Sequence, residues 1–320
     1  YDWRLSLDSL IVNGVERDGK IYYEEASSTP YIEQTLKQLA ATSTTGKVTL
    51  VAHSNGGSVV KALLAKLGPE ETARLVDKII FIGVPQTGAP QALGALLFGD
   101  HEGLPKDNLP FLASRSAARG LAENSPMAYH LLPSQKYLQE TQDPSHAILS
   151  FSGSVFYPNE RTAYGTSIDT LTELDNFLLA AENGRNKPAP EDVNSANVLN
   201  STLISYANST HASLDTWVPP SSVSVYQIAG WGANTISGID FYDEQKLIGI
   251  TVGHKKQYRL SFVEDGDEVV PIPSALMMST STQNIFRYWV NLREAKKGHG
   301  DFLEIEDLRN FIESILTNSE

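Results

Sequence analysis

Apolar residues follow two spacings along this chain, one typical of buried strands and one typical of helices. Residues 48–52 (VTLVA) form a short apolar run, as buried parallel strands do. Apolar residues then recur at helical spacing over residues 59–67, and Gly68-Pro69 predicts the end of that helix. Residues 78–84 (KIIFIGV) predict a second buried strand. The order strand, helix, strand predicts a parallel α/β sheet.

The same two spacings predict the elements on either side of this segment. They indicate an amphipathic helix at 32–40, core strands at 223–229 and 285–290, a hairpin at 246–262 and a closing helix at 304–316. Most of these elements belong to one α/β core.

The interval between the second and third strands is too long for a simple crossover. It contains helices rich in leucine and alanine at 91–98, 116–122 and 170–181, and a polar stretch at 183–201. We interpret it as a mainly helical cap, or lid, inserted into the core; a set of ordinary helical crossovers is the alternative. The predicted domains are a first part of the core at 1–90, the cap at 91–221 and a second part of the core at 222–320.

Composition narrows the class of protein. The 320 residues are 41% hydrophobic, which is enough for one large core or a core and a cap. A net charge of −13 argues against nucleic acid as a partner, because phosphates would be repelled. The chain has no cysteine and no histidine pair at the i, i+4 spacing of a helical metal site, so we expect no metal and no cofactor. No apolar run reaches about 18 residues, so no transmembrane segment is expected.

The compartment is not fixed by the sequence. We expect a soluble protein, with secretion and a cell-surface position both open, and the lack of cysteine favours a prokaryotic origin. The chain opens at Tyr1 without a visible signal peptide.

Ser54 lies in the turn His-Ser-Asn-Gly-Gly between the first predicted strand and its helix. A serine needs a base within hydrogen-bond reach and donors for the oxyanion that forms. A sharp turn between strand and helix lifts the hydroxyl clear of the sheet, and it requires small neighbours such as Ala52 and Gly56. We therefore predict that Ser54 is a nucleophile and that the backbone N–H of Asn55 is an oxyanion donor. A tight turn with an incidental serine is the structural alternative.

Enzymes with such an elbow carry their triad in the order Ser, acid, His. The acidic turn at 264–271 follows a strand, and we choose Asp267 as the acid, with Asp265 as the second choice. A solvated acidic loop is the alternative. His299 lies 32 residues after Asp267, between glycines that allow its loop to bend, and it is the predicted base.

The other six histidines are interpreted as surface or packing residues. His53 is next to the nucleophile, and we expect its side chain to point away from the site. The remaining histidines lie in the predicted hairpin or cap: His101, His130, His146, His211 and His254.

These segments together resemble the α/β-hydrolases of the lecithin:cholesterol acyltransferase-like lipase family. The matching motifs are YDWRL at 1–5, the elbow around Ser54, GVPQTGAP at 83–90, SPMAY at 125–129 with LLP at 131–133, GDEVVP at 266–271, and His299 before an apolar pair. The resemblance covers nearly the whole chain. It implies a mostly parallel sheet flanked by helices with an inserted cap, lipid or other ester substrates, and Ser54, Asp267 and His299 as the catalytic residues.

The sequence departs from the family pattern at the acidic turn, at the elbow around Ser54 and in the N-terminal part of the fold. Glu268 and Val269 stand where the family has Gly-Thr, and Ala52 and Asn55 replace the common glycine and methionine. The resemblance implies earlier strands and a loop that supplies the second oxyanion donor, and we expect both to be missing from this chain. Strand 48–52 would then have a bare edge, so we expect an N-terminal fragment of the same precursor to complete the sheet.

The sequence therefore predicts a serine hydrolase that cleaves carboxylic esters through an acyl-enzyme. An apolar cap would suit acyl chains, with Leu96, Leu97, Phe98, Phe111 and Leu112 as candidates that could equally be core. An acyltransferase with the same three residues is an alternative, because only the acceptor changes from water to an alcohol. A peptidase or amidase is less favoured. A catalytically silent binding module with a hydrolase fold is the alternative from another class.

Overall fold

The computed structural model describes residues 4–11, 15–18, 20–22, 32–100, 114–141, 147–153, 157–182, 184–248, 251–278 and 284–317. Contacts between residues divide the chain into two compact units. Unit 1 consists of Tyr1–Thr87, Ala212–Thr235 and Glu264–Glu320, and unit 2 of Gly88–His211 and Ile236–Val263.

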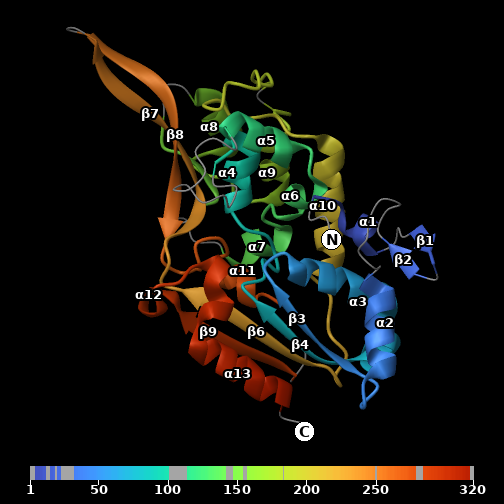
Figure 1. Ribbon diagram of the computed structural model, residues 1–320. Helices are drawn as coiled ribbons and strands as arrows, with labels where there is room; N and C mark the ends of the chain where they lie inside the picture. The colour runs from blue at the N-terminus through green and yellow to red at the C-terminus, as the bar shows by residue number, and fades with distance from the viewer. Residues whose placement is uncertain are drawn as a thin grey trace. The chain divides into compact units, whose positions relative to one another are not determined.

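Unit 1 contains a parallel sheet with the strand order β3-β4-β6-β9 (Figure 1). Its strands are β3 (Val48–His53), β4 (Val76–Ile82), β6 (Ser224–Trp231) and β9 (Ile285–Asn291). Each neighbouring pair is parallel, so the carboxyl ends of all four strands meet at one edge of the sheet. The predicted strands correspond to these four, with boundaries shifted by up to two residues.

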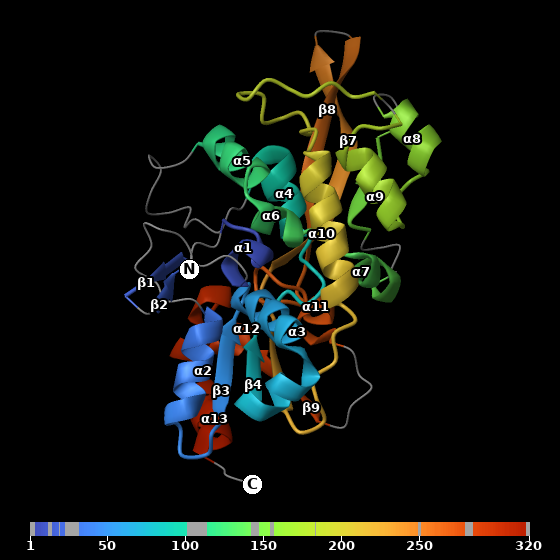
Figure 2. The same ribbon diagram turned by 90° about the vertical axis from the view of Figure 1, so that its right-hand side faces the viewer.

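Helices cover both faces of this sheet. On one face, α13 (Glu306–Thr317) packs its leucine and isoleucine side chains against Ile80, Ile82 and Ile228. On the other side lie α2 (Ile32–Thr42) and α3 (Gly56–Leu75), which contact β3 (Figures 1 and 2). The predicted fold class, a mostly parallel α/β sheet flanked by helices as in α/β-hydrolases, is confirmed.

Helix α3 changes direction at Gly68, where the backbone leaves the helical region with φ 79° and ψ 169°. That conformation suits glycine, and Pro69 then begins a second helical segment without needing an N–H partner. The predicted end of the first helix at Gly68-Pro69 is confirmed. The remaining elements of unit 1 are α1 (Leu7–Ile11), β1 (Val15–Arg17), β2 (Lys20–Tyr22), α11 (Ile272–Leu276), α12 (Leu292–Ala295) and the 3₁₀ helix η2 (His299–Glu304).

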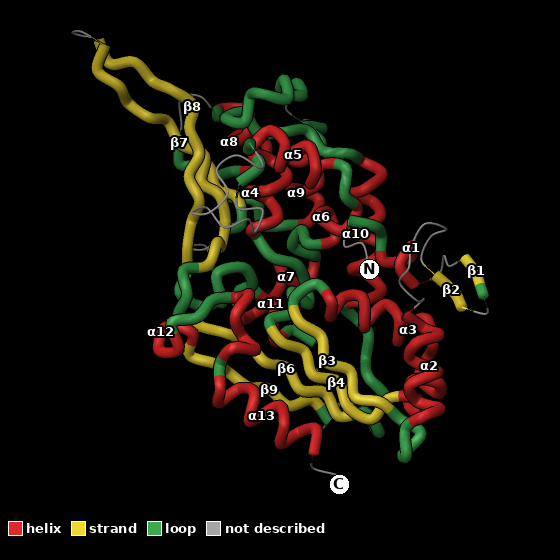
Figure 3. Tube along the Cα trace, viewed as in Figure 1, coloured by secondary structure: helices red, strands yellow, loops and turns green. Residues whose placement is uncertain are grey.

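Unit 2 combines helices with a sheet of order β5-β7-β8, of which β7 and β8 are labelled in Figure 3. Its elements are α4 (Gln91–Phe98), α5 (Arg115–Glu123), α6 (Pro126–His130), α7 (Gln135–Glu140), β5 (Leu149–Phe151), α8 (Pro158–Tyr164), α9 (Leu171–Leu178), α10 (Ser201–Leu214, to His211 in this unit), β7 (Thr235–Ile248) and β8 (Thr251–Val263). The hairpin of β7 and β8 is longer than predicted. Because Leu149 of β5 pairs with Ile239 of β7, residues 236–263 belong to unit 2, whereas the predicted boundaries placed them in the second part of the core.

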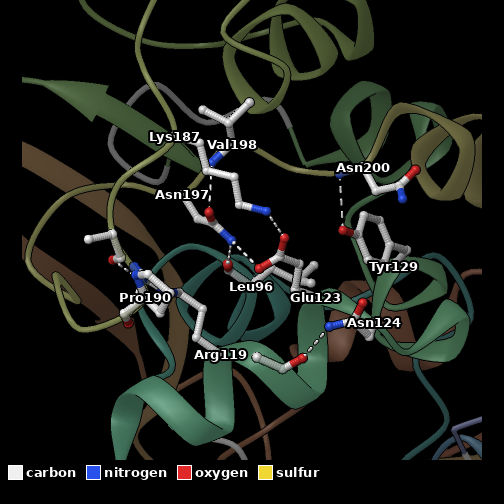
Figure 4. A network of polar contacts seen from close by, with 12 residues as sticks. Leu96, Arg119, Glu123, Asn124, Tyr129, Lys187, Pro190, Asn197, Val198 and Asn200 are labelled. Carbon is white, nitrogen blue, oxygen red and sulfur yellow. Dashed lines mark hydrogen bonds and ion pairs between the residues drawn. The ribbon is translucent and has the colours of Figure 1, made fainter.

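Polar contacts hold residues 184–200, which form no helix or strand, against α5. The guanidinium of Arg119 is 3% exposed and donates hydrogen bonds to the carbonyls of Ala189 (3.0 Å), Pro190 (2.8 Å) and Asp192 (2.9 Å). Nearby, Asn197 Nδ2 donates to the Leu96 carbonyl and to Glu123 (Figure 4). These bonds satisfy main-chain oxygens that a strand or helix would otherwise satisfy.

Strand β3 lies at one edge of the unit 1 sheet. Within the described residues it pairs with β4 alone, and the Val51 side chain is 47% exposed. The expectation that a further segment pairs along this edge stays a prediction.

Candidate active site

The chain makes a sharp turn at Ser54 between β3 and α3. Ser54 has a φ of +53°, a left-handed backbone conformation that residues other than glycine rarely adopt. Its N–H donates to the Ile82 carbonyl at 2.9 Å, and its own carbonyl accepts from Gly57 N–H at 3.0 Å. These bonds fix the strained residue between the end of the sheet and the first turn of the helix.

Small residues are required around this turn. A Cβ on Gly57 would lie 2.3 Å from Val84 Cγ1, so the loop after β4 can pass the helix only because position 57 has no side chain. The second glycine of Ser-Asn-Gly-Gly therefore has a steric cause, which is the close approach of the loop after β4 to α3.

The structure brings Ser54, His299 and Asp267 together. His299 Nε2 lies 2.8 Å from Ser54 Oγ, and His299 Nδ1 lies 2.9 Å from Asp267 Oδ2. All three residues belong to unit 1. Ser54 follows β3, and His299 follows β9 and α12, whereas Asp267 follows β8, a strand of the other sheet. We call this arrangement the Ser54–His299–Asp267 row.

Asp267 is fully buried and both of its oxygens accept hydrogen bonds. Oδ1 accepts from the N–H groups of Val269 (3.0 Å) and Val270 (2.7 Å), while Oδ2 faces the His299 ring. The acid turn is tied further by Glu268 N–H, which donates to Thr235 Oγ1 at 2.9 Å. Asp265, the second choice of the sequence analysis, is exposed and is not part of the row.

Two glycines allow the row to form. A Cβ on Gly83 would lie 2.9 Å from Asp267 Oδ2 and 3.2 Å from His299 Cε1, and Gly83 itself has a φ of +54°. A Cβ on Gly230 would lie 2.9 Å from Asp267 Cβ and 2.8 Å from the Phe302 ring. The residue after β4 and the next-to-last residue of β6 are thus small enough to admit the carboxylate and the imidazole.

Asn55 follows the nucleophile candidate and precedes α3. In the part of the chain that the structure describes, its N–H donates no backbone hydrogen bond, and its Oδ1 is buried without a hydrogen-bond partner. An N–H at the start of a helix carries partial positive charge, so it can stabilise an anion beside Ser54.

The predicted orientation of His53 is wrong. Its side chain does not point away from the site: Nε2 lies 2.8 Å from the His299 carbonyl oxygen, and the two rings are 4.7 Å apart between centroids. Burial and the neighbouring His299 lower the pKa of His53 below its ordinary value, although the bond to the carbonyl opposes the shift. Its place directly before Ser54 was the one sequence signal of this contact.

Other candidate residues divide between unit 2 and the parts of the chain outside the description. His130 and His211 are buried in unit 2, where their rings stack with centroids 4.5 Å apart, as packing residues do. Outside the described residues lie His101, His146, Phe111, Leu112 and the start of the YDWRL motif, as does the side chain of His254. The described residues hold no group of three or more side chains suited to a metal, and none of their helices could span a membrane.

Comparison with known proteins agrees with the fold and the motifs. No curated protein matches the sequence. Among solved structures, one similar chain comes from the crystal structure of the Tle4–Tli4 complex, with 17% identity and a TM-score of 0.48. The similarity covers 80% of this chain and 56% of that one, so this chain spans about half the length of its structural relative. The family model for lecithin:cholesterol acyltransferase matches residues 1–303. The chain therefore belongs to the lecithin:cholesterol acyltransferase family.

Proposed function

We propose that this protein is a serine hydrolase that cleaves carboxylic esters of lipids through an acyl-enzyme. The observation that carries the proposal is the Ser54–His299–Asp267 row, with its two contacts of 2.8 Å and 2.9 Å. Membership of a family of lipid acyltransferases supports a lipid ester as the substrate.

Each member of the row has one task in this mechanism. His299 Nε2 removes the proton of Ser54 as Oγ attacks the ester carbonyl, and Asp267 holds the imidazole in the tautomer with a proton on Nδ1. The negative charge that develops on the carbonyl oxygen is stabilised by Asn55 N–H. His299 then donates its proton to the leaving alcohol, which leaves an acyl group on Ser54.

Water completes the reaction in a hydrolase. His299 removes a proton from a water molecule, the resulting oxyanion collapses, and the carboxylic acid leaves as Ser54 regains its proton. An acyltransferase follows the same steps with an alcohol in place of water. The family match favours this second candidate specifically, because its name describes acyl transfer.

A fluorophosphonate probe tests the proposal directly, because it reacts preferentially with an activated serine. We expect the wild-type protein to be labelled and Ser54→Ala to remain unlabelled, with parallel loss of hydrolysis of chromogenic esters of increasing chain length. A folded wild-type protein that is neither labelled nor active would contradict the proposal and favour a silent binding module. Adding a long-chain alcohol separates the two candidates, since a transferase yields a new ester and a hydrolase a free acid.

We further propose that a segment of the same precursor pairs with the edge of β3 that has no partner strand among the described residues. The exposed Val51 and this edge support the proposal, because an apolar edge strand is prone to pairing. Native mass spectrometry of the protein purified from its source is expected to give a particle heavier than the 35.0 kDa chain. An active particle with the mass of the chain alone would contradict it.

A further inference from the structure

His53 connects the strand that carries Ser54 to the loop that carries His299. It is the last residue of β3, and its Nε2 lies 2.8 Å from the main-chain oxygen of His299. The neighbouring residue Ser54 makes the second link to His299, from Oγ to Nε2. Two consecutive residues of the elbow therefore hold the main chain and the side chain of the same histidine.

The chemistry of the contact fixes the state of His53. A carbonyl oxygen only accepts hydrogen bonds, so His53 Nε2 must carry a proton and donate it. A lowered pKa keeps the ring neutral near pH 7. Neutrality matters because His299 becomes positively charged when it takes the proton of Ser54, and a second cation 4.7 Å away would oppose that step.

The geometry of the loop explains why a hydrogen bond to the His299 carbonyl is needed. His299 is the first residue of η2 and lies between Gly298 and Gly300, whose backbones have wide freedom. Phe302 packs against both imidazole rings, with centroids 6.1 Å from His53 and 6.3 Å from His299. The bond from His53 is a direct polar link between β3 and the main chain at this loop.

We propose that His53 is a positioning residue that sets the His299 imidazole against Ser54 by holding the His299 carbonyl. The proposal rests on the proposed serine-hydrolase function, because it gives His53 a role only if His299 acts as the base. It differs from the role of Asp267, which orients the ring through Nδ1.

Two amide substitutions test the bond with little change in volume. In His53→Gln the side-chain nitrogen can occupy the place of Nε2, whereas in His53→Asn it can reach only the place of Nδ1. We expect His53→Asn to lower kcat by about 10-fold to 100-fold with KM changed less than about 3-fold, as a misplaced base does. His53→Gln should retain at least about a third of the wild-type kcat by the same reasoning.

His211 provides a matched control, because its Nε2 lies 2.7 Å from the carbonyl oxygen of His130 in unit 2. His211→Asn removes the same kind of bond outside the row, so it should lower the melting temperature and leave kcat unchanged. A loss of kcat equal to that of His53→Asn would mean that the effect is general loosening and would overturn the proposal.

Fluorophosphonate labelling separates failure of this inference from failure of the proposed function. If wild-type Ser54 is labelled and His53→Asn keeps its full kcat, the positioning role is wrong while the hydrolase stands. If His53→Asn does not fold, equal kcat in His53→Gln and in His53→Leu overturns the proposal, and rescue by Gln alone supports it. If the wild-type protein is not labelled, both the proposed hydrolase function and the role of His53 are contradicted.

Discussion

At the residue scale, Asp267 is the most demanding position of the site. It accepts two main-chain N–H groups on one oxygen and the His299 ring on the other, so it must act as an acceptor on both sides. An amide cannot do this, because its NH₂ group would face either two N–H donors or the protonated Nδ1 of His299. The carboxylate is thus specified by its surroundings as well as by its charge.

Asp267→Asn is therefore expected to abolish most ester hydrolysis. By analogy with the same exchange in serine proteases, the loss of kcat should be on the order of 10³-fold to 10⁴-fold, because His299 is held in the wrong tautomer. Asp265→Asn is the matched control in the same turn, where an exposed carboxylate should be dispensable. Steady-state kinetics on one chromogenic ester measures both. An equal loss of kcat in the two variants would mean that Asp267 is not the catalytic acid.

Gly83 is the second residue whose identity the site dictates. In Gly83→Ala the new methyl group would press on Asp267 Oδ2 and His299 Cε1, and a φ of +54° disfavours alanine in addition. We expect kcat to fall at least about 10-fold because the imidazole is displaced.

Gly120→Ala is the control for this substitution. Gly120 lies in α5 with open space around its Cα, so alanine should stabilise the helix by up to about 1 kcal/mol and leave kcat unchanged. Thermal unfolding and kinetics of the two variants separate a local steric effect from a general response to an added methyl group. Full activity in Gly83→Ala would show that the row tolerates displacement.

At the element scale, hydrophobic spacing predicted the core strands because they are buried and short. β4 is the clearest example, with Ile79, Ile80, Phe81 and Ile82 each no more than 1% exposed. The spacing failed at β7, whose start at Thr235 lies 11 residues before the predicted hairpin. Pairing of β7 with the short strand β5 is a long-range contact, and local periodicity carries no signal of it.

Arg119 determines the conformation of a segment that has no regular structure. Its guanidinium is buried and bonded to main-chain carbonyls at 189, 190 and 192, so Arg119→Met would remove all of these hydrogen bonds. The Ala189 carbonyl would keep only Asp192 N–H as a donor, and the Pro190 carbonyl only the Ser116 hydroxyl. A hydrogen bond from a charged donor contributes about 1.5–3 kcal/mol. We expect faster tryptic cleavage after Arg185, which lies in the released segment, whereas Lys187 precedes Pro188 and is not a tryptic site.

Arg74→Met is the control for this experiment. Arg74 pairs with Glu71 on the surface of α3, and exposed pairs of this kind contribute little. Its cleavage rate in residues 184–200 should equal that of the wild type. Unchanged cleavage in Arg119→Met would mean that other contacts, such as those of Asn197, hold the segment.

At the scale of the whole molecule, the order of the motifs was predictable and their approach in space was not. The order Ser54, Asp267, His299 follows from the chain, and parallel strands bring their carboxyl ends to one edge. The contact of His53 with the His299 carbonyl depends on how η2 lies over β3, and the place of His53 directly before Ser54 was its one local signal. The same holds for the assignment of residues 236–263 to unit 2.

The same contact makes the stability of the protein depend on pH. The pKa of His53 is lowered in the folded state below its ordinary value of 6.5, mainly by burial and next by the nearby His299, with Asp267 acting in the opposite direction. Below pH 6.5 the unfolded chain therefore binds more protons at this position than the folded protein does. The free energy of unfolding must then fall as pH decreases from about 6.5 towards the folded pKa, and it is unaffected by this group at higher pH.

The variant His53→Gln tests this dependence, because it has no titrating group at position 53 and keeps the hydrogen bond. We expect urea unfolding to give the largest advantage of the wild type over His53→Gln, in free energy of unfolding, above pH 7. This advantage should be smaller at pH 5. A difference that stays constant over this range would mean that His53 titrates in the folded protein as it does in the unfolded chain, and that the ring is less enclosed by His299 and Phe302 than the structure describes.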